Sequence, residues 1–360
     1  MTAVVTREQG SSLAAGRLPK WAPWVALVAS MVVSGVVFAL INLGEPAADF
    51  NVAGTLVVGV IIYLVAIYVL SRLSESPRHA TDRFVTALVA SAFIIAIIPL
   101  VSLLYTVVSA GVERFDIQYF SESMRGVVGT GGGAVHAIWG TILITLAATV
   151  ISVPIGLMTS IYLVEYGGKG KLARAITFFV DVMTGIPSIV AGLFVFAMFS
   201  IFLGPGASLG IMGAIALSVL MIPVVVRSSE ELLRIVPNEL REASYALGVP
   251  KWRTITKVVL PTSIAGITTG IMLSISRVIG ETAPLLLTAG FTTSLNTNLF
   301  DGRMMTLPVF VYNQYQNQGT NPDEAVARAW AGALTLILIV MALNLVARLI
   351  AKIFAPKLRG

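Results

Sequence analysis

Long apolar stretches, separated by short polar segments, run along almost the whole chain. Each contains about 20 residues, the length of a helix that crosses a bilayer core of about 30 Å. They lie near residues 24–43, 52–70, 85–109, 136–163, 176–203, 209–226, 266–290 and 329–354. The first is longer than the apolar region of a signal peptide and a second follows directly, so we interpret it as an uncleaved anchor. The pattern predicts an all-α, polytopic membrane protein with about 8 spans.

Composition and charge agree with this prediction. Apolar residues make up 56% of the 360 residues and charged residues 12%, about half the charged share of a soluble domain. If the residues before the first span are cytoplasmic, nearly all Lys and Arg residues lie near the cytoplasmic ends of spans. The exceptions are Arg114, Arg125, Arg277, Arg303 and Arg328. The positive-inside rule therefore predicts a multi-pass protein of the cell (plasma or inner) membrane with both termini cytoplasmic. The net charge of +6 then reflects topology and does not indicate nucleic-acid binding.

Two glycine-containing segments could in principle bind phosphate. The backbone amides of Gly129-Thr130-Gly131-Gly132-Gly133 could cradle an anion, but no basic residue adjoins them in sequence, so we favour a flexible lead into the next span. A P-loop requires G-x-x-x-x-G-K-[ST]. The nearest candidate, Gly170-Lys171-Leu172, lacks the first glycine and the hydroxyl residue. We therefore expect this chain not to hydrolyse ATP. The absence of cysteine excludes disulfides and thiolate metal sites.

Four prolines, Pro154, Pro187, Pro223 and Pro284, lie inside the apolar runs. A proline removes a backbone amide and its ring clashes with the preceding turn, so each is expected to bend its helix. Such bends are frequent in transport proteins, but they are also frequent in membrane helices generally.

A charged island at residues 237–261 separates two apolar runs. Pro237 is tolerated in a first helical turn, Gly248 suits a left-handed helix stop, and Pro250 opens a second segment. The first segment has apolar or small residues at steps i, i+3, i+4 and i+7, namely Leu240, Ala243, Ser244 and Leu247. We predict a short amphipathic helix, a corner at Gly248 and a second helix. From these residues alone, a basic cytoplasmic linker that faces lipid headgroups is an equally good interpretation.

The next span carries small and polar residues at steps of three and four: Gly266, Gly270, Ser274, Arg277 and Glu281. The two glycines are typical of a helix-packing face. A charge at mid-bilayer costs about 2.5–3.5 kcal/mol, so Arg277 and Glu281 are expected to face protein or water. Their spacing allows a mutual ion pair that only fixes the helix. It equally allows a place on a substrate pathway, where the planar fork of arginine suits an oxyanion.

The charged island resembles a known motif. Glu242-Ala243-Ser244, Gly248, Val258 and Leu260-Pro261 have the spacing of the EAA loop of ABC importer permeases, with small departures at Ser244 and Val258. In that family the loop docks into a cleft of the ATPase subunit. The resemblance implies that the loop couples this chain to an ATPase through one set of residues, Glu242, Ala243, Ser244, Gly248, Leu260 and Pro261.

A second resemblance indicates a substrate. The segment 277–286, RVIGETAPLL, resembles the RxxGETAPLL signature of PstA-type permeases of phosphate ABC importers, and residues 163–166, 181–192 and 306–312 resemble other motifs of that family. The resemblance covers about residues 84–354 and implies the transmembrane-domain fold of a type I ABC importer. It implies a permease for inorganic phosphate. We assign Ser274, Arg277 and Glu281 to the substrate pathway, no residue to catalysis and none to a metal.

The family also implies partners. They are a second permease (PstC type), an ATPase dimer (PstB type) that binds Mg-ATP, and an external phosphate-binding protein (PstS type); no cofactor is expected in this chain. We divide the chain into an extra N-terminal two-span segment at 1–75, the family's first span and outer loop at 76–135, and the core permease domain at 136–360. Residues 290–323, rich in Asn, Gln, Thr and Gly, are expected to face outward as part of the platform for the binding protein.

Two other functions remain open at this point. The same architecture could import another oxyanion, such as sulfate or molybdate. A secondary transporter or channel working alone predicts inverted repeats and no ATPase-docking elbow, and we find no clear repeat. An enzyme is least favoured, because His79 and His136 fall on opposite sides of the membrane in this topology and no nucleophile-base or metal constellation appears.

Overall fold

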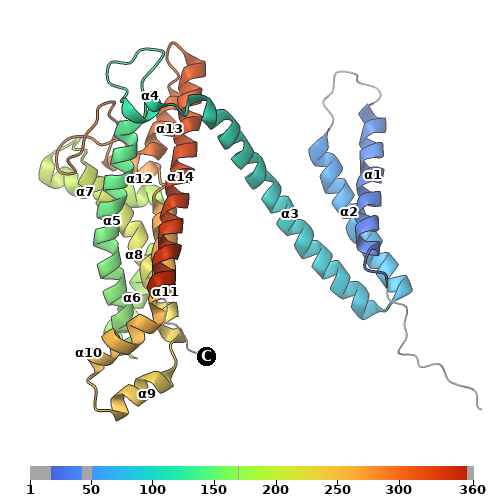
Figure 1. The fold of residues 1–360 in the computed structure, drawn as a ribbon, viewed down its shortest axis with the longest axis horizontal. Coiled ribbons are helices and arrows are strands. Elements are labelled where there is room, and N and C mark those ends of the chain that lie inside the picture. The colour runs from blue at the N-terminus through green and yellow to red at the C-terminus, as the bar shows by residue number, and fades with distance from the viewer. Residues whose placement is uncertain (1–17, 43–50, 169, 355–360) are drawn as a thin grey trace, which may run out of the picture. The chain divides into compact units, whose positions relative to one another are not determined.

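A computed structural model describes residues 18–42, 51–168 and 170–354, and within these ranges the ordered elements are helices (Figure 1). In the described ranges, 7 helices are long and apolar enough to cross a membrane, or up to 8 if one bent pair counts as a span. The prediction of an all-α, multi-span membrane protein is confirmed.

The long helices match most of the predicted spans. They are α1 (Ala22–Asn42), α2 (Val52–Ser74), α3 (Pro77–Gly111), α5 (Val135–Ile161), α8 (Gly210–Ile235), α11 (Leu260–Val278) and α14 (Pro322–Phe354). The shorter helices are α4 (Ile117–Ser121), α6 (Lys171–Thr184), α7 (Ser188–Leu203), α9 (Asn238–Ala246), α10 (Lys251–Thr254), α12 (Ala283–Thr288) and α13 (Leu307–Gln316). Two π-helical turns, Tyr162–Tyr166 and Ile255–Val259, extend α5 and precede α11.

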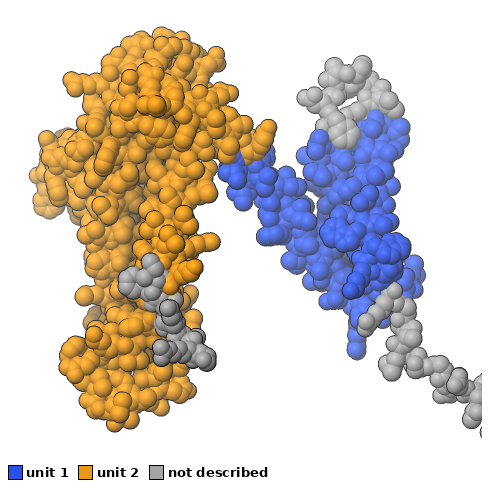
Figure 2. Space-filling model, in the orientation of Figure 1, with its two compact units in different colours: residues 1–104 blue, residues 105–360 orange. Residues whose placement is uncertain are grey.

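The chain forms two compact units, residues 1–104 and 105–360, and the boundary along the sequence falls within α3 (Figure 2). In the first unit, the turn between α2 and α3 is held by the carboxylate of Glu75. It accepts hydrogen bonds of 2.8 Å from the Leu18 amide, 2.7 Å from Ser71 and 2.8 Å from both Nε and Nη2 of Arg83. Burial raises the pKa of Glu75, but these hydrogen bonds outweigh it and lower the pKa to about 2. The segment before α1 is therefore tied to the α2–α3 turn by a carboxylate that is ionised at neutral pH.

In the second unit α8 is the central helix, packed against α5, α7 and α11. Glycines allow the backbones to approach closely. A Cβ at Gly266 would lie 2.6 Å from a Leu232 methyl carbon, and a Cβ at Gly270 would lie 2.8 Å from Ser228 Cβ, both on α8. The predicted packing role of these two glycines of α11 is confirmed.

The span predicted at 176–203 is not one straight helix. α6 and α7 meet at an angle of 108°. The bend falls at Gly185-Ile186-Pro187, where proline lacks an amide and disfavours a helical residue before it. Pro154 and Pro223, by contrast, lie inside α5 and α8, which continue past them.

The span predicted at 266–290 is wrong at both ends. The helix begins at Lys251, passes through the π-helical turn and ends at Val278. Gly280 lies in the turn that follows, and Pro284 is in the first turn of the separate helix α12. Glycine and proline together end the helix here, so Glu281 lies outside it.

The predicted outward segment 290–323 contains a buried helix. α13 has fully buried Leu307, Val309 and Phe310, and the Leu307 amide donates a 2.7 Å hydrogen bond to Thr141 Oγ1 of α5. The segment before α13 lies directly on α5 at Gly140, where a Cβ would stand 1.9 Å from the Met305 carbonyl oxygen. Because residues 290–323 are polar on average, their composition alone does not predict a buried helix.

We therefore expect Gly140→Ala to destabilise the protein by about 1–3 kcal/mol, because the backbone of residue 305 must move to make room. The midpoint of thermal unfolding in detergent measures this. Gly185→Ala is the matched control, since its Cβ would be 3.6 Å from the nearest atom, an ordinary contact. Equal midpoints for the two variants would contradict the close packing of α5 on residue 305.

Candidate transport and coupling sites

The charged island forms the elbow that the sequence predicts. We use "elbow" for residues 237–261, which comprise α9, the Gly248 corner, α10 and the following π-helical turn. Gly248 has φ of 72°, and α9 ends in a Schellman motif: the Gly248 amide donates to the Tyr245 carbonyl at 2.9 Å and the Val249 amide to the Ser244 carbonyl at 3.2 Å. The predicted corner at Gly248 is confirmed.

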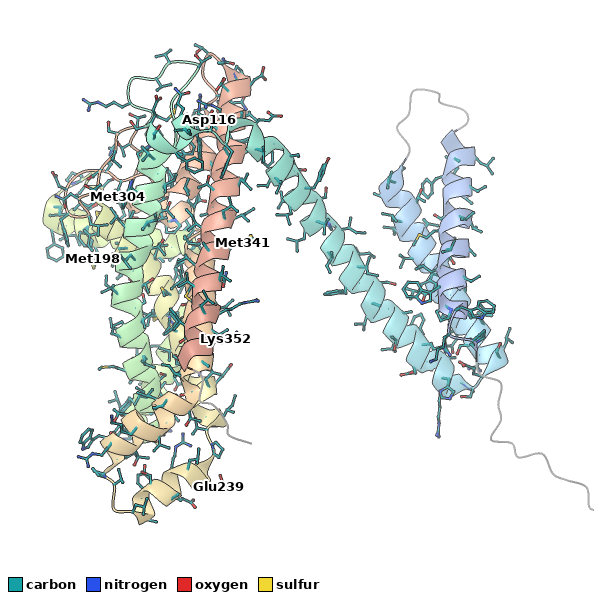
Figure 3. The ribbon with its side chains drawn as sticks, in the orientation of Figure 1. Asp116, Met198, Glu239, Met304, Met341 and Lys352 are labelled. Carbon is teal, nitrogen blue, oxygen red and sulfur yellow. The ribbon has the colours of Figure 1, made fainter. Side chains whose placement is uncertain are left out.

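The faces of α9 differ from the prediction. Of the predicted stripe only Ser244 is buried, and its hydroxyl lies 2.9 Å from that of Thr254, which joins the two halves of the elbow. Leu240, Glu242 and Ala243 are exposed, and the exposed fraction of Leu247 is 83%. Glu239, in the first turn of α9, marks the end of the second unit at which the elbow lies (Figure 3). The elbow thus presents apolar side chains that none of the described residues covers.

Leu260 and Pro261 start α11 directly after the π-helical turn. Pro261 is at the helix start, where a missing amide costs little. Leu260 is half-buried against Leu233, Val236 and Ile267. Both residues belong to the junction of elbow and span, as expected.

Arg277, in the last turn of α11, is uncovered. Gly266 and Gly270 pack on α8, and the hydroxyl of Ser276 accepts a 3.2 Å hydrogen bond from Asn344 of α14. Ser274 is fully buried and donates to the Ile271 carbonyl at 2.6 Å. Arg277 follows Gly270 by seven positions and so lies on nearly the same side of the helix, yet it is exposed. Helix packing therefore covers Ser274 but leaves Arg277, one turn further on, uncovered.

Arg277 and Glu281 do not pair in the structure. Among the described residues neither side chain makes a hydrogen bond or an ion pair. An ion pair between positions i and i+4 requires a continuous helix, and α11 ends before Glu281. An unpaired arginine on the uncovered face of a membrane helix is unfavourable against lipid, so this face requires water or another protein.

The glycine segment is held by arginines that are distant in sequence. Arg328 donates from Nη1 to the carbonyls of Gly129 at 3.1 Å and Gly131 at 3.0 Å, and Arg114 donates from Nη2 to the Gly132 carbonyl at 3.1 Å. Both arginines are buried, and Arg114 Nε lies 3.4 Å from a Glu324 carboxylate oxygen. No basic residue adjoins these glycines in sequence, but the fold brings two arginines to their carbonyls. The guanidinium groups are engaged by carbonyls, an arrangement that gives no phosphate cradle.

Two further features escaped sequence reasoning. Arg241 of the elbow forms an ion pair with Glu165 of the π-helical turn after α5, although 76 positions separate them. The second feature is helix α13 itself, because its sequence shows no clear helical period. In the described part of the chain, no group of three or more His, Cys, Asp or Glu residues is placed to hold a metal ion.

The fold and the uncovered sites define a class: a multi-span helical subunit of a membrane permease. Residues 152–360 match the family model described as binding-protein-dependent transport system inner membrane component. Phosphate transport system permease protein PstA 1 of Mycobacterium tuberculosis is 47% identical over 279 residues, covering 76% of this chain and 89% of that protein. PstA of Yersinia pestis is 38% identical over 286 residues, covering 79% and 94%. The chain belongs to this transport family and, within it, to the PstA permeases.

Solved structures agree on the fold. The crystal structure of a bacterial alginate ABC transporter, in complex with a pentasaccharide-bound periplasmic protein, contains a chain that matches with a TM-score of 0.53 at 16% identity, covering 76% of this chain and 96% of that one. The inward-facing MetNI methionine ABC transporter contains one with a TM-score of 0.50 at 19% identity, covering 62% and 96%. The predicted ABC importer transmembrane fold is confirmed.

A substitution at the corner tests the elbow. No heavy atom lies within 4 Å of a Cβ at Gly248, so the cost of Gly248→Val is conformational, about 1–2 kcal/mol, from the positive φ. We expect normal membrane insertion and loss of association with the ATPase subunit, measured by co-purification. Gly248→Asn is the matched control, because asparagine tolerates the left-handed region. Normal transport by the Val variant would contradict the docking role.

Proposed function

We propose that the chain is the permease subunit of an ATP-driven importer of inorganic phosphate. The observation that carries the proposal is the 47% identity to a phosphate transport permease along 89% of its length. The relatives' names favour phosphate over the other oxyanions that the residues alone leave open. Arg277 supports the same substrate class, since a guanidinium offers two parallel donors to an oxyanion.

Arg277 supplies the positive charge that a phosphate ion needs in a low-dielectric passage. Because its uncovered side needs water or another protein, we place the pathway between this chain and a second permease. Glu281 contributes a negative charge at the same end of α11 and weakens net binding of phosphate, so that the ion can leave. Ser274, which is buried and satisfied, acts on the pathway only through the packing of α11.

Energy reaches the chain through the elbow. Its uncovered apolar residues, Leu240, Tyr245, Leu247 and Trp252, offer a docking surface of the kind that fits a protein cleft. The partner is an ATPase dimer, which binds Mg-ATP, and an external phosphate-binding protein delivers the substrate. A transporter working alone has no use for an exposed elbow of this kind.

The distribution of basic residues supports an orientation with both termini and the elbow in the cytoplasm. Single cysteines test it, because the chain has none of its own. Thr297, in the predicted outward segment, and Ala246, in the elbow, are suitable positions because both are exposed, whereas Ser244 of the elbow is buried. A membrane-impermeant thiol reagent should label Thr297→Cys in intact cells, and Ala246→Cys only in inverted vesicles stripped of the ATPase. The opposite pattern would overturn the topology.

Substitution of Arg277 tests the pathway. We expect Arg277→Gln to abolish phosphate uptake while the complex remains assembled, and Arg277→Lys to restore little, since the forked geometry is lost. Arg348→Gln, at an exposed arginine of α14, is the matched control and should retain uptake. Uptake in vesicles is measured at equal abundance of the complex.

The double variant Arg277→Gln/Glu281→Gln separates a pathway role from a packing role. A pathway cation predicts no uptake, because both charges are gone and phosphate meets no donor. Near-normal uptake by the double variant would leave the two residues as a structural device only.

A further inference from the structure

The elbow has a second attachment to the membrane helices besides the chain itself. Along the chain it continues only into α8 before it and α11 after it. Arg241 of α9 reaches Glu165, at the end of α5, with Nε at 3.0 Å and Nη2 at 2.9 Å from one carboxylate oxygen. The Glu165 side chain is only 5% exposed and that of Arg241 only 12%. This is a buried ion pair across two elements that are not neighbours in sequence.

Arg241 also closes the end of α8. It donates to the Leu233 carbonyl at 2.9 Å and to the Val236 carbonyl at 2.6 Å, both at the C-terminus of α8, where carbonyls lack helical partners. One guanidinium therefore joins α5, α8 and α9. A further contact runs from Nη1 to Asn238 Oδ1 at 3.4 Å. All three nitrogens of the planar fork therefore donate, an arrangement that lysine cannot reproduce.

Lys251 provides a parallel link from the other half of the elbow. Its ammonium donates to the Glu165 backbone carbonyl and lies 4.9 Å from the centre of the Tyr166 ring. Both halves of the elbow thus contact the same turn of α5. That turn is π-helical, as is the turn where the elbow enters α11. Such turns are wider than an α-helix and are frequent at functional sites.

α5 connects this turn to the opposite end of the unit. It spans Val135 to Ile161 before the π-helical turn, and near its start Thr141 holds the amide of Leu307 in α13. A displacement of Glu165 along the helix axis would therefore act on α13, since a packed helix moves as a rigid body.

We infer that the Glu165–Arg241 ion pair transmits the movement of the elbow to α5, and through α5 to α13. The inference rests on the proposed function, in which an ATPase moves the elbow. Without the pair, only Lys251 and the packing of α5 on α8 connect the elbow to α5. ATP is then hydrolysed, but the far end of the pathway follows the elbow less often. Glu165 and Arg241 are positioning residues, and they touch neither ATP nor phosphate.

The test uses the assembled complex in lipid vesicles and measures the number of phosphate ions transported per ATP hydrolysed. We expect Glu165→Gln to lower this ratio by about 2- to 30-fold, the range that mutations along a coupling route produce, while ATP hydrolysis and complex abundance stay near those of the unmodified protein. Arg234→Gln is the matched control. It removes an ion pair with Glu230 at the same end of α8, but that pair lies within one helix. The control should leave the ratio unchanged.

A covalent cross-link between the two positions distinguishes loss of coupling from misfolding of the variant. In the cysteine-free chain, the pair Glu165→Cys/Arg241→Cys should be uncoupled when reduced and regain coupling when joined by a short thiol cross-linker. Full coupling in the reduced form, or no recovery on cross-linking, would overturn the inference. If the unmodified chain itself fails to recruit the ATPase, the proposed function fails instead, so the two failures are distinguishable.

Discussion

The close packing of α5 and α11 on α8 is the interaction on which both sites depend. Glycines at 266 and 270 bring the α11 backbone onto α8, and Gly156 of α5 comes so near α8 that a Cβ would be 2.7 Å from a Val225 methyl carbon. Such contacts fix the rotation of each helix, because no larger residue can turn into the interface. The packing buries Ser274 of α11 and leaves Arg277, in the last turn of the helix, exposed. The position of α5 beside α8 places Glu165 within reach of the elbow.

The placement of charge follows from the same constraint. A buried ion needs partners, because the interior offers little solvation. Four buried charged side chains have partners within the chain, in the form of ion pairs, carbonyls or amides: Glu75, Glu165, Arg114 and Arg328. Arg277 is the contrast: among the described residues it has no ion pair and stays on an uncovered face. A subunit that pairs the buried charges named above internally and leaves Arg277 exposed near the end of a membrane helix is suited to share that charge with a substrate.

The predictable features of the structure are the local ones. Apolar periodicity places most spans, and the elbow follows from Pro237, Gly248 and Pro250, whose backbone preferences act over a few residues. The pairing of Arg277 with Glu281 fails, because spacing assumes a helix that Gly280 and Pro284 end. Arg328 on Gly129 and Arg241 on Glu165 join residues 199 and 76 positions apart, and periodicity carries no information about such contacts. The burial of α13 is unpredictable for the same reason, because its hydrogen-bond partner Thr141 belongs to α5, far away in sequence.

The central claim is that this chain turns ATP hydrolysis by a partner into the movement of phosphate. The most direct measurement is ATP hydrolysis by the purified complex in lipid, with the external binding protein loaded with phosphate, with sulfate offered instead, or without ligand. The account predicts that hydrolysis rises only with the phosphate-loaded binding protein. Equal rates in all three conditions, or a larger stimulation by sulfate, would contradict it.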